Sequence, residues 1–512
     1  MRHQSLAQLF MSNAPESLHT AGGRRRFGEA LHAAATRTKA YPAFLAEHGV
    51  DVAEALRRND PKMLPTTSKR SYIERYSIGD LCLDGRPSAG YTIEKSSGYS
   101  GASHYWFRTP DEDALFPAYL EFAFRQFYKI DRIPTLIIIG LALGTWTSGE
   151  KMAQALRQVA ATGKYELTVT SPGINSDEIL ETVRDVSPFY GQTVIVGYPP
   201  FVKSVIDRGI ERGIDWKRLS VKLGLGGEGY SEEWRAHMAA KLGVDVTRDL
   251  LAISGGYGAA DLGMSVGREY PLTVQIRQLC ASDSDLAIDL FGEPSVPNLF
   301  QYNPSSHFIE EVDGELVFSV LSGIPLVRYR IGDRGGTLGF DRAMSVLSDH
   351  GYDVFARLDA AGYQRDEVWS LPLFYCSGRT DGTIIIGGLN VYPENIGSVL
   401  TALADPALVG YKVASVAGPD EHSNRLLILL EHRGAVSVQE TARLAEYYAP
   451  LLIEGLQRVN KEYRRLSEGA PELARPEVRV YGEGRGPFAG DVGKIKKNYL
   501  LSPNTQETAD SA

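Results

Sequence analysis

The sequence predicts an α/β protein with a large N-terminal body built from several sheets and a small α+β C-terminal domain. Up to about residue 375, short apolar runs alternate with amphipathic helical stretches, which is typical of α/β layers around a largely parallel sheet. After Gly378 the pattern changes to a few strand-like runs and one long amphipathic helix. A chain of 512 residues is long enough for two or more domains with buried cores.

The elements of the body follow from the apolar pattern in chain order. The run at 133–143 is too short and too interrupted to span a bilayer, so we expect a buried strand there. A strand, helix, strand order is predicted over 133–171 and again over 192–227. The segment 336–373 breaks this rhythm, with one expected helix at about 344–358, and we interpret it as an insertion.

The C-terminal part has a different order of elements. Strand-like runs are TIIIGG, YKVASVAG, RLLILLEH and EVRVYG, and the long helix is expected from about Val438 to Leu466. We therefore predict an N-terminal domain over 1–377, a C-terminal domain over 378–500 and a disordered polar tail over 501–512.

Composition and charge exclude several classes of protein. Hydrophobic residues make up 43% and charged residues 23% of the chain, which is ordinary for a globular protein. The net charge of −9 gives no reason to expect nucleic acid or an anionic membrane as a partner. Three well-separated cysteines and an N-terminus without a signal-like apolar stretch fit a cytoplasmic protein. We expect a monomer or a homodimer that acts on small molecules.

The stretch from Gly224 to Gly229 satisfies GxGxxG, so a dinucleotide-binding dehydrogenase is one alternative. Glu232 and Glu233, however, place two carboxylates at the start of the following helix, where a pyrophosphate would need positive potential. A tight turn that lets strand and helix pack closely explains the glycines as well. The Walker A, HExxH and GxSxG sequences do not occur.

Five segments concentrate glycines, hydroxyls and charges in a way that suits nucleotide chemistry. They are EKSSGYSGAS at 94–103, GGYGAADLG at 255–263, RYRIGD at 328–333, GRTDG at 378–382 and GKIKK at 493–497. A Ser/Gly loop can wrap phosphate oxygens with N–H groups and hydroxyls. A tyrosine ring can stack on a purine, and carboxylates can hold Mg²⁺ or accept ribose hydroxyls. Each segment alone also fits a turn or a solvated charge, but their order and spacing together indicate a function.

In these motifs the sequence resembles the adenylate-forming superfamily of acyl-CoA synthetases, nonribosomal adenylation domains and luciferases. Within it, the sequence is similar to the phenylacetate-CoA ligase-like branch. The resemblance covers most of the chain and implies an acyl-CoA synthetase-like fold whose C-terminal domain is a mobile lid. It also implies ATP and Mg²⁺ as cofactors, with CoA as a candidate co-substrate.

The resemblance implies a role for each matching residue. Lys494 would be the catalytic lysine, Asp381 the hinge of the lid and Asp261 the Mg²⁺ ligand. The expected nucleotide-binding residues are Ser96, Ser97, Gly98, Ser100, Gly101, Gly227, Glu228, Tyr257, Gly258, Asp333 and Arg379. By analogy, the expected acid-pocket residues are Trp146, Tyr198, Phe201 and Gly226.

The chain departs from the family pattern near its phosphate-binding segments. Ala102 and Ser103 stand where a lysine usually follows the phosphate loop, which leaves phosphate orientation to backbone groups and Lys95. Ala260 stands where Thr or Ser is usual, before an acid that is Asp261 and not Glu. With YGAADLG, LNVYPENI and the insertion, the chain resembles atypical members linked to antibiotic assembly, including phenazine pathway proteins and ATP-dependent amide synthetases.

The implied function is ATP-dependent activation of a carboxylic acid as an acyl-adenylate, with release of pyrophosphate. Transfer of the acyl group to CoA or a small amine would follow, with a carrier-protein thiol as a third acceptor. An aryl or heteroaryl acid of secondary metabolism or aromatic catabolism is the expected substrate. Ala102 and Ala260 leave open a degenerate nucleotide-binding member without turnover.

Overall fold

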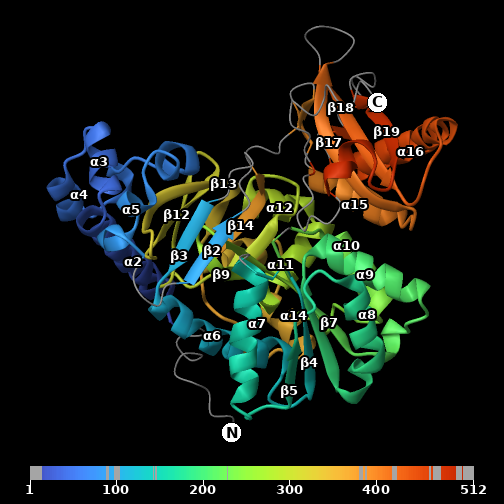
Figure 1. Ribbon diagram of the computed structural model, residues 1–512, viewed down its shortest axis with the longest axis horizontal. Helices are drawn as coiled ribbons and strands as arrows, with labels where there is room; N and C mark the ends of the chain where they lie inside the picture. The colour runs from blue at the N-terminus through green and yellow to red at the C-terminus, as the bar shows by residue number, and fades with distance from the viewer. Residues whose placement is uncertain are drawn as a thin grey trace.

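The protein is described from a computed structural model (Figure 1). The structure describes residues 14–87, 92–96, 104–141, 143–144, 147–227, 229–379, 384–386, 389–391, 393–417, 424–460, 463–464, 467, 474–491 and 499.

A helical layer forms the beginning of the body. It consists of α2 (Glu16–Arg37), α3 (Ala40–Glu47), α4 (Val52–Arg58), α5 (Ile78–Leu81), the short turns η1 (Pro61–Met63), η2 (Lys69–Ile73) and η3 (Leu83–Gly85), and strand β1 (Thr67–Ser68). The hairpin of β2 (Thr92–Ser96) and β3 (His104–Arg108) follows. Helix α6 (Pro110–Tyr128) then starts with a capping box, in which Thr109 and Glu112 satisfy each other's backbone N–H groups.

Parallel strands joined by helices form one half of the main sheet. Their order along the chain is β4 (Thr135–Gly140), α7 (Thr147–Ala161), β5 (Leu167–Thr170), α8 (Ser176–Asp185), η4 (Ser187–Phe189), β6 (Gln192–Gly197), α9 (Pro199–Glu211), η5 (Trp216–Arg218), β7 (Val221–Gly226), α10 (Glu232–Leu242) and β8 (Ile253–Ala259). The strands lie in the order β5-β4-β6-β7-β8, all parallel. The predicted strand, helix, strand units and the buried strand within 133–143 are confirmed.

Antiparallel strands form the other half of the same sheet. The elements are β9 (Gly263–Arg268), α11 (Pro271–Ser282), α12 (Ser284–Phe291), β10 (Asn298–Gln301), β11 (Phe308–Val312), β12 (Glu315–Val320), β13 (Leu326–Leu338), α13 (Phe340–Asp349), α14 (Val354–Ala360), η6 (Arg365–Glu367) and β14 (Leu373–Arg379). They extend the sheet in the order β8-β9-β10-β14-β13-β12-β11, and β1 pairs with β13. The largely parallel prediction therefore fails beyond β8. Short turns join β8 to β9, β11 to β12 and β12 to β13, whereas helices connect β9 to β10 and β13 to β14. Asp313 and Gly314, for example, both have positive φ (56° and 76°), as a two-residue hairpin turn requires.

The parallel half is buried on both faces. Leu136 and Ile138 of β4 pack against α8, α9 and α10, whereas Ile137 and Ile139 pack on the opposite face with α6, α7 and α11. This alternation is the two-residue period of a strand. We call the side with α6, α7 and α11 the α6 face.

The segment 336–373 contains two helices and not the single predicted helix at 344–358. Gly351 has φ +77° and separates α13 from α14, and Asp353 caps the second helix by accepting from the backbone N–H of Ala356. Val346, Leu347 and Leu358 are buried in the same core as α6 and α11. The segment is therefore an integral part of the body's core.

The C-terminal unit has its own sheet and core. It contains β15 (Ile384–Ile386), β16 (Leu389–Val391), α15 (Pro393–Leu403), β17 (Leu408–Ala417), β18 (Asn424–His432), α16 (Val438–Val459), β19 (Glu477–Gly482) and η7 (Gly486–Asp491). The long helix ends at Val459 instead of the predicted Leu466, because Asn460 is extended. Strands β17, β18 and β19 form a three-stranded sheet, and α15 lies against α10 of the body (Figure 1). Arg433 also forms an ion pair with Glu211.

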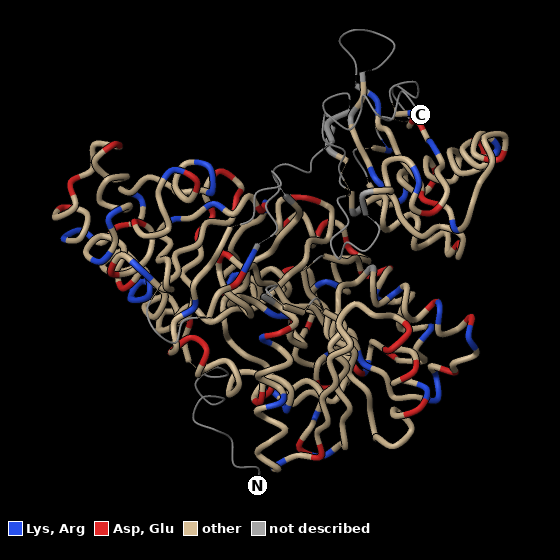
Figure 2. Tube along the Cα trace, in the orientation of Figure 1, with Lys and Arg blue, Asp and Glu red and all other residues tan. Residues whose placement is uncertain are grey.

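Charges of both signs alternate along the outer helices of the body (Figure 2). Asp177 of α8 pairs with Arg208 of α9 at 2.8 Å and with Arg212 at 2.5 Å. Within the described ranges, no helix combines the length and apolar composition needed to cross a bilayer.

Candidate functional site

The carboxyl ends of the parallel strands bring several predicted residues to one edge of the sheet. Gly140 pairs with Gly197, and Gly226 pairs with Gly256, so β4, β6, β7 and β8 end side by side. The segments that follow these strands contain Tyr198, Gly227 and Asp261. Ligands of open α/β sheets bind at this kind of edge. This edge is therefore the candidate site.

Two predicted nucleotide-binding residues contact each other there. The Tyr257 hydroxyl donates a hydrogen bond to Asp333 Oδ2. The Tyr257 ring packs parallel to Phe318, with centroids 6.0 Å apart, and edge-on to Phe374 at 5.2 Å. Asp333 is also the strand partner of Arg379, which lies at the end of β14. Residues from three of the five motifs thus converge across β8, β13 and β14.

Asp261, the predicted metal ligand, is buried at 3% exposure. The Tyr329 hydroxyl donates to Asp261 Oδ2 at 2.7 Å, and Lys69 Nζ lies 3.4 Å from the same oxygen. Both contacts use Oδ2. Among the described residues, no cluster of three or more His, Cys, Asp or Glu side chains could hold a metal ion. Mg²⁺ can take a single protein carboxylate and complete its shell with phosphates and water.

Arg108 ties the stem of the predicted phosphate loop to the turn that carries Asp261. Its Nε donates to Glu94 of β2 at 2.8 Å, its Nη1 donates to Ser322 at 3.0 Å, and its Nη2 donates to the Ala260 carbonyl oxygen. Glu94 also pairs with Lys151 of α7 at 3.3 Å. No sequence pattern predicts this group of contacts, because its residues lie on separate elements.

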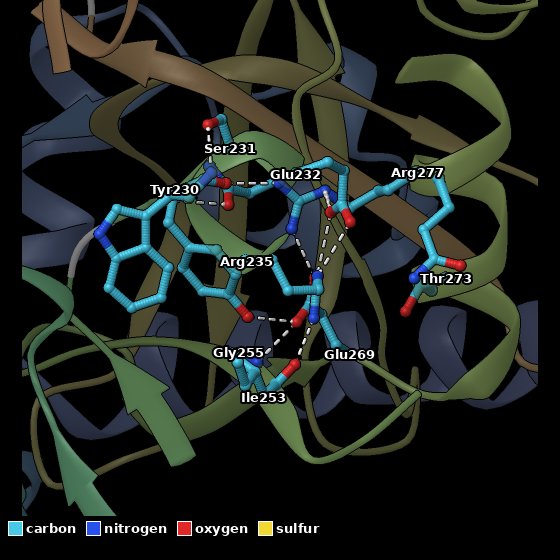
Figure 3. A network of polar contacts seen from close by, with 12 residues as sticks. Tyr230, Ser231, Glu232, Arg235, Ile253, Gly255, Glu269, Thr273 and Arg277 are labelled. Atoms are coloured by element: carbon cyan, nitrogen blue, oxygen red, sulfur yellow. Dashed lines mark hydrogen bonds and ion pairs between the residues drawn. The ribbon is translucent and has the colours of Figure 1, made fainter. Parts of the chain in front are cut away.

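A second buried network supports the strand that carries Tyr257 (Figure 3). Glu269 accepts from Arg235 at 2.6 Å, from Arg277 at 2.5 Å and from the Tyr230 hydroxyl at 2.6 Å. It also accepts from the Gly255 backbone N–H at 2.6 Å. Burial alone would raise the pKa of Glu269, but the charges of the two arginines outweigh it and lower the pKa to about 2. Glu269 therefore stays ionised and fixes the start of the 255–263 loop.

His307 contacts the backbone of the same 255–263 loop. Its Nε2–H donates to the Leu262 carbonyl oxygen at 3.0 Å. Burial lowers the pKa of His307 to about 4, from an ordinary value of 6.5. The folded protein therefore keeps this imidazole neutral, next to the residue that follows Asp261.

We expect acid to destabilise the protein through His307. Between pH 6.5 and about 4, the unfolded chain binds a proton at this position and the folded chain does not. The free energy of unfolding should fall across that window, by up to about 3 kcal/mol from this group. Urea unfolding at several pH values should show a smaller fall for His307→Asn. The exposed His32→Asn variant is the control, and equal slopes for wild type and His307→Asn would contradict the assignment.

The predicted acid-pocket residues that the structure describes lie near the same edge. Tyr198 is buried, and its hydroxyl lies 3.1 Å from Ser148 Oγ. Phe201 packs within 3.3 Å of the position that a Cβ on Gly140 would take. Gly226 is open, because an added Cβ would meet only the Gly256 carbonyl oxygen, at 3.5 Å.

Glycines of the GxGxxG stretch serve packing. A Cβ on Gly224 would lie 2.9 Å from the Tyr128 hydroxyl, and a Cβ on Gly229 would lie 2.2 Å from Asn298 Nδ2. Gly227 has φ +81°, which side chains rarely adopt. Glu232 of the next helix pairs with the buried Arg235. These contacts favour the structural explanation of the motif over the dinucleotide-binding one.

Comparisons with known proteins agree with this geometry. No protein-family model matches the chain. A phenylacetate-coenzyme A ligase of Thermus thermophilus is 24% identical over 374 residues, covering 72% of this chain and 72% of that protein. A phenylacetate-coenzyme A ligase of Aromatoleum evansii is 22% identical over 305 residues, covering 59% of this chain and 57% of that protein.

Solved structures extend the likeness to the C-terminal unit. 2-Hydroxyisobutyryl-CoA ligase in the postadenylation state, in complex with 2-HIB-AMP, matches with a TM-score of 0.63 and 13% identity, over 100% of this chain and 97% of that chain. The GH3.15 acyl acid amido synthetase matches with a TM-score of 0.58 and 14% identity, over 100% of this chain and 97% of that chain. The chain has the fold of these two enzymes and is similar in sequence to the phenylacetate-coenzyme A ligases. The resemblance seen in its motifs is thereby confirmed at this level.

Several of the predicted site residues lie outside the described residues. They are Ser97, Gly98, Ser100, Gly101, Trp146, Glu228, Asp381 and Lys494. For Ser96 and Arg379 the structure describes the backbone but not the side chain. The described members of the superfamily motifs are Gly226, Gly227, Tyr257, Gly258, Asp261 and Asp333.

Proposed function

We propose that the protein joins a carboxylic acid to AMP and then transfers the acyl group to CoA or a small amine. A carboxylate oxygen attacks the α-phosphorus of ATP, the bond from that phosphorus to the bridging oxygen breaks, and pyrophosphate leaves. The thiol or amine then attacks the acyl carbon and loses its proton, and AMP leaves. The observation that carries this proposal is the contact between Tyr257 and Asp333 at the edge of an adenylate-forming fold.

The described residues suit the nucleotide half of this reaction. Asp333 is buried at 7% exposure and receives one hydrogen bond from Tyr257. A carboxylate offers several lone pairs, so Asp333 would accept ribose hydroxyls while Tyr257 fixes its orientation. Gly227, Gly258 and the Tyr257 ring would hold the adenine, and Arg379 would contact ribose or phosphate.

Phosphate binding would rest on the 96–101 loop. Its stem is anchored by the ion pair of Glu94 with Arg108, and Arg108 also donates to the Ala260 carbonyl oxygen. Ser96, Ser97 and Ser100 would guide the β- and γ-phosphates together with the backbone N–H groups. Lys69, which lies 3.4 Å from Asp261, would supply a cation beside the turn in which Ala260 replaces the family's threonine or serine.

Charge control would come from Asp261 and Lys494. Mg²⁺ bound at Asp261 would neutralise phosphate charge. Lys494 would place a cation between the attacking carboxylate and the α-phosphate, which are both anionic. We propose that residues 378–500 form a lid that carries Lys494 to the site by movement at Asp381. Closure would also keep water away from the acyl-adenylate.

A pyrophosphate-release screen tests the proposal. Purified protein, ATP and Mg²⁺ are combined with a panel of aryl, heteroaryl and aliphatic acids, and each reaction is repeated with hydroxylamine, CoA or a simple amine. We expect pyrophosphate release that depends on an aryl or heteroaryl acid, and a thioester or amide with the native acceptor. Calorimetric binding of ATP without pyrophosphate release for any acid would contradict turnover and favour the nucleotide-binding alternative.

A further inference from the structure

Among the residues that the structure describes, three buried side-chain donors on the α6 face lack hydrogen-bond partners, and so do two amide acceptors on that face, Gln192 Oε1 and Gln301 Oε1. Within the described ranges, Tyr128 Oη, Ser254 Oγ and Arg268 Nε have no partner. Tyr128 and Ser254 are 0% exposed, and Arg268 is 8% exposed. Buried polar groups are normally hydrogen-bonded, because leaving one without a partner costs about 1–3 kcal/mol. Three such groups near one another need an explanation.

The strand register places these groups together. Ser254 pairs with Gly224, and Gly256 pairs with Arg268. Residues opposite each other on neighbouring strands point to the same face, as do residues two apart on one strand. The Tyr128 hydroxyl lies 2.9 Å from the position of an added Cβ on Gly224, and Arg268 Cγ lies 3.9 Å from that position on Gly256. The three groups therefore share the α6 face of β7, β8 and β9.

Arg268 is a buried cation, which is unusual for a side chain without a carboxylate partner. A guanidinium is always protonated in proteins. The structure gives Arg268 a cation–π contact with the Phe127 ring at 4.7 Å, and no carboxylate of the described residues lies within ion-pair distance of it. Arg235 and Arg277, by contrast, each pair with buried glutamates. A buried cation without an anion is strongly unfavourable, so an anion from outside the chain would complete this site.

The site lies where the acid is expected. Gly226, an expected acid-pocket residue, points to the α6 face, and the expected pocket residue Tyr198 is buried in the core on that face. Gly256 is adjacent to Tyr257 in the chain. The Tyr257 ring packs on the opposite face, with Phe318 and Phe374. An acid held on the α6 face would therefore meet the nucleotide at the carboxyl edge of the sheet, where Gly226 pairs with Gly256, and its far end would extend along the α6 face toward Arg268.

We propose that the substrate is a dicarboxylic acid whose second carboxylate binds Arg268. This inference rests on the proposed function and names the substrate class of that site. The guanidinium can donate two parallel hydrogen bonds to one carboxylate, and the hydroxyls of Tyr128 and Ser254 can donate to its remaining lone pairs. One carboxylate is activated and the other is held, so the acid binds in one orientation.

Matched acid pairs test the inference. Benzoate is compared with isophthalate, and 2-naphthoate with naphthalene-2,6-dicarboxylate, by the kcat/KM for pyrophosphate release. Wild type should prefer the diacid of at least one pair, and Arg268→Met should lower the diacid-to-monoacid ratio by about 10- to 100-fold. Arg268→Lys, which keeps a cation but loses the forked donors, should give an intermediate ratio.

A second variant guards against misfolding of Arg268→Met. Tyr128→Phe removes a hydroxyl that has no partner in the protein, so its thermal midpoint should equal or exceed that of wild type. It should still lower the diacid ratio several-fold. A ratio unchanged in both variants, or no diacid preference in an active wild type, would overturn the inference and leave the proposed function intact.

The affinity of the diacid, measured by calorimetry without ATP, tests the subsite independently of turnover. Weaker binding by Arg268→Met than by wild type supports the subsite even if no acid yields pyrophosphate. Absent or equal binding overturns it. Failure of adenylation alone therefore contradicts the proposed function and not the subsite.

Discussion

Lys494→Ala is expected to reduce carboxylate-dependent exchange of pyrophosphate into ATP to background, a loss of at least about 100-fold. The attacking carboxylate and the α-phosphate repel each other, and the repulsion is greatest in the transition state. A cation placed between them acts mainly there, so its removal should lower kcat more than it raises KM for ATP. Exchange measured with radiolabelled pyrophosphate gives the rate of this half-reaction without the acceptor.

Lys496→Ala is the matched control, because it removes the same charge two residues away in the same segment. It should retain exchange within a few-fold of wild type. Equal exchange by Lys494→Ala and wild type would refute the assigned mechanism. Loss of transfer to CoA or amine with full exchange would instead place Lys494 in the second half-reaction only.

Glu269→Ala is expected to lower the free energy of unfolding of the body by about 3–5 kcal/mol. The change leaves Arg235 and Arg277 to share one carboxylate, that of the partly buried Glu232. It also removes the acceptor of the Tyr230 hydroxyl and of the Gly255 N–H. A buried charge without its partner is the main part of this loss. Denaturant unfolding followed by tryptophan fluorescence measures the effect.

Two further variants show whether the stability lost in Glu269→Ala arises from unbalanced charge or from lost packing. Glu29→Ala removes an exposed glutamate that pairs with Arg26 at 3.1 Å, and should change stability by less than about 1 kcal/mol. Adding Arg277→Met to Glu269→Ala restores neutrality and should recover part of the lost stability. If the double variant is less stable than Glu269→Ala, the loss does not arise from unbalanced charge.

The sequence predicted the elements of the body better than the contacts among them. The alternation of Leu136 and Ile138 with Ile137 and Ile139 reflects a local period, so the buried strand was predictable. The single helix expected at 344–358 was wrong. The helical spacing of apolar residues continues across Gly351, but the positive φ of Gly351 ends the helical backbone there. The antiparallel half was missed because pairing direction depends on which distant strands meet.

In the candidate site too, individual residues were predictable from the sequence, but the contacts among them were not. Tyr257 and Asp333 were predicted from motifs, but their hydrogen bond joins residues 76 positions apart. Glu269 and Arg268 were missed, because a charged residue in a sequence is ordinarily read as exposed. Their burial depends on packing between β8, β9 and α11, which no local pattern reveals.

Separate cores have a consequence for how such a protein can diversify. The buried residues that line Arg268 belong to the core shared by α6 and α11, whereas the core of the C-terminal unit draws only on residues from 391 onward. Substitutions in cores that share no members affect stability independently. Under the proposed lid movement and acid subsite, mutations that change acid selectivity and mutations that change closure could therefore accumulate separately.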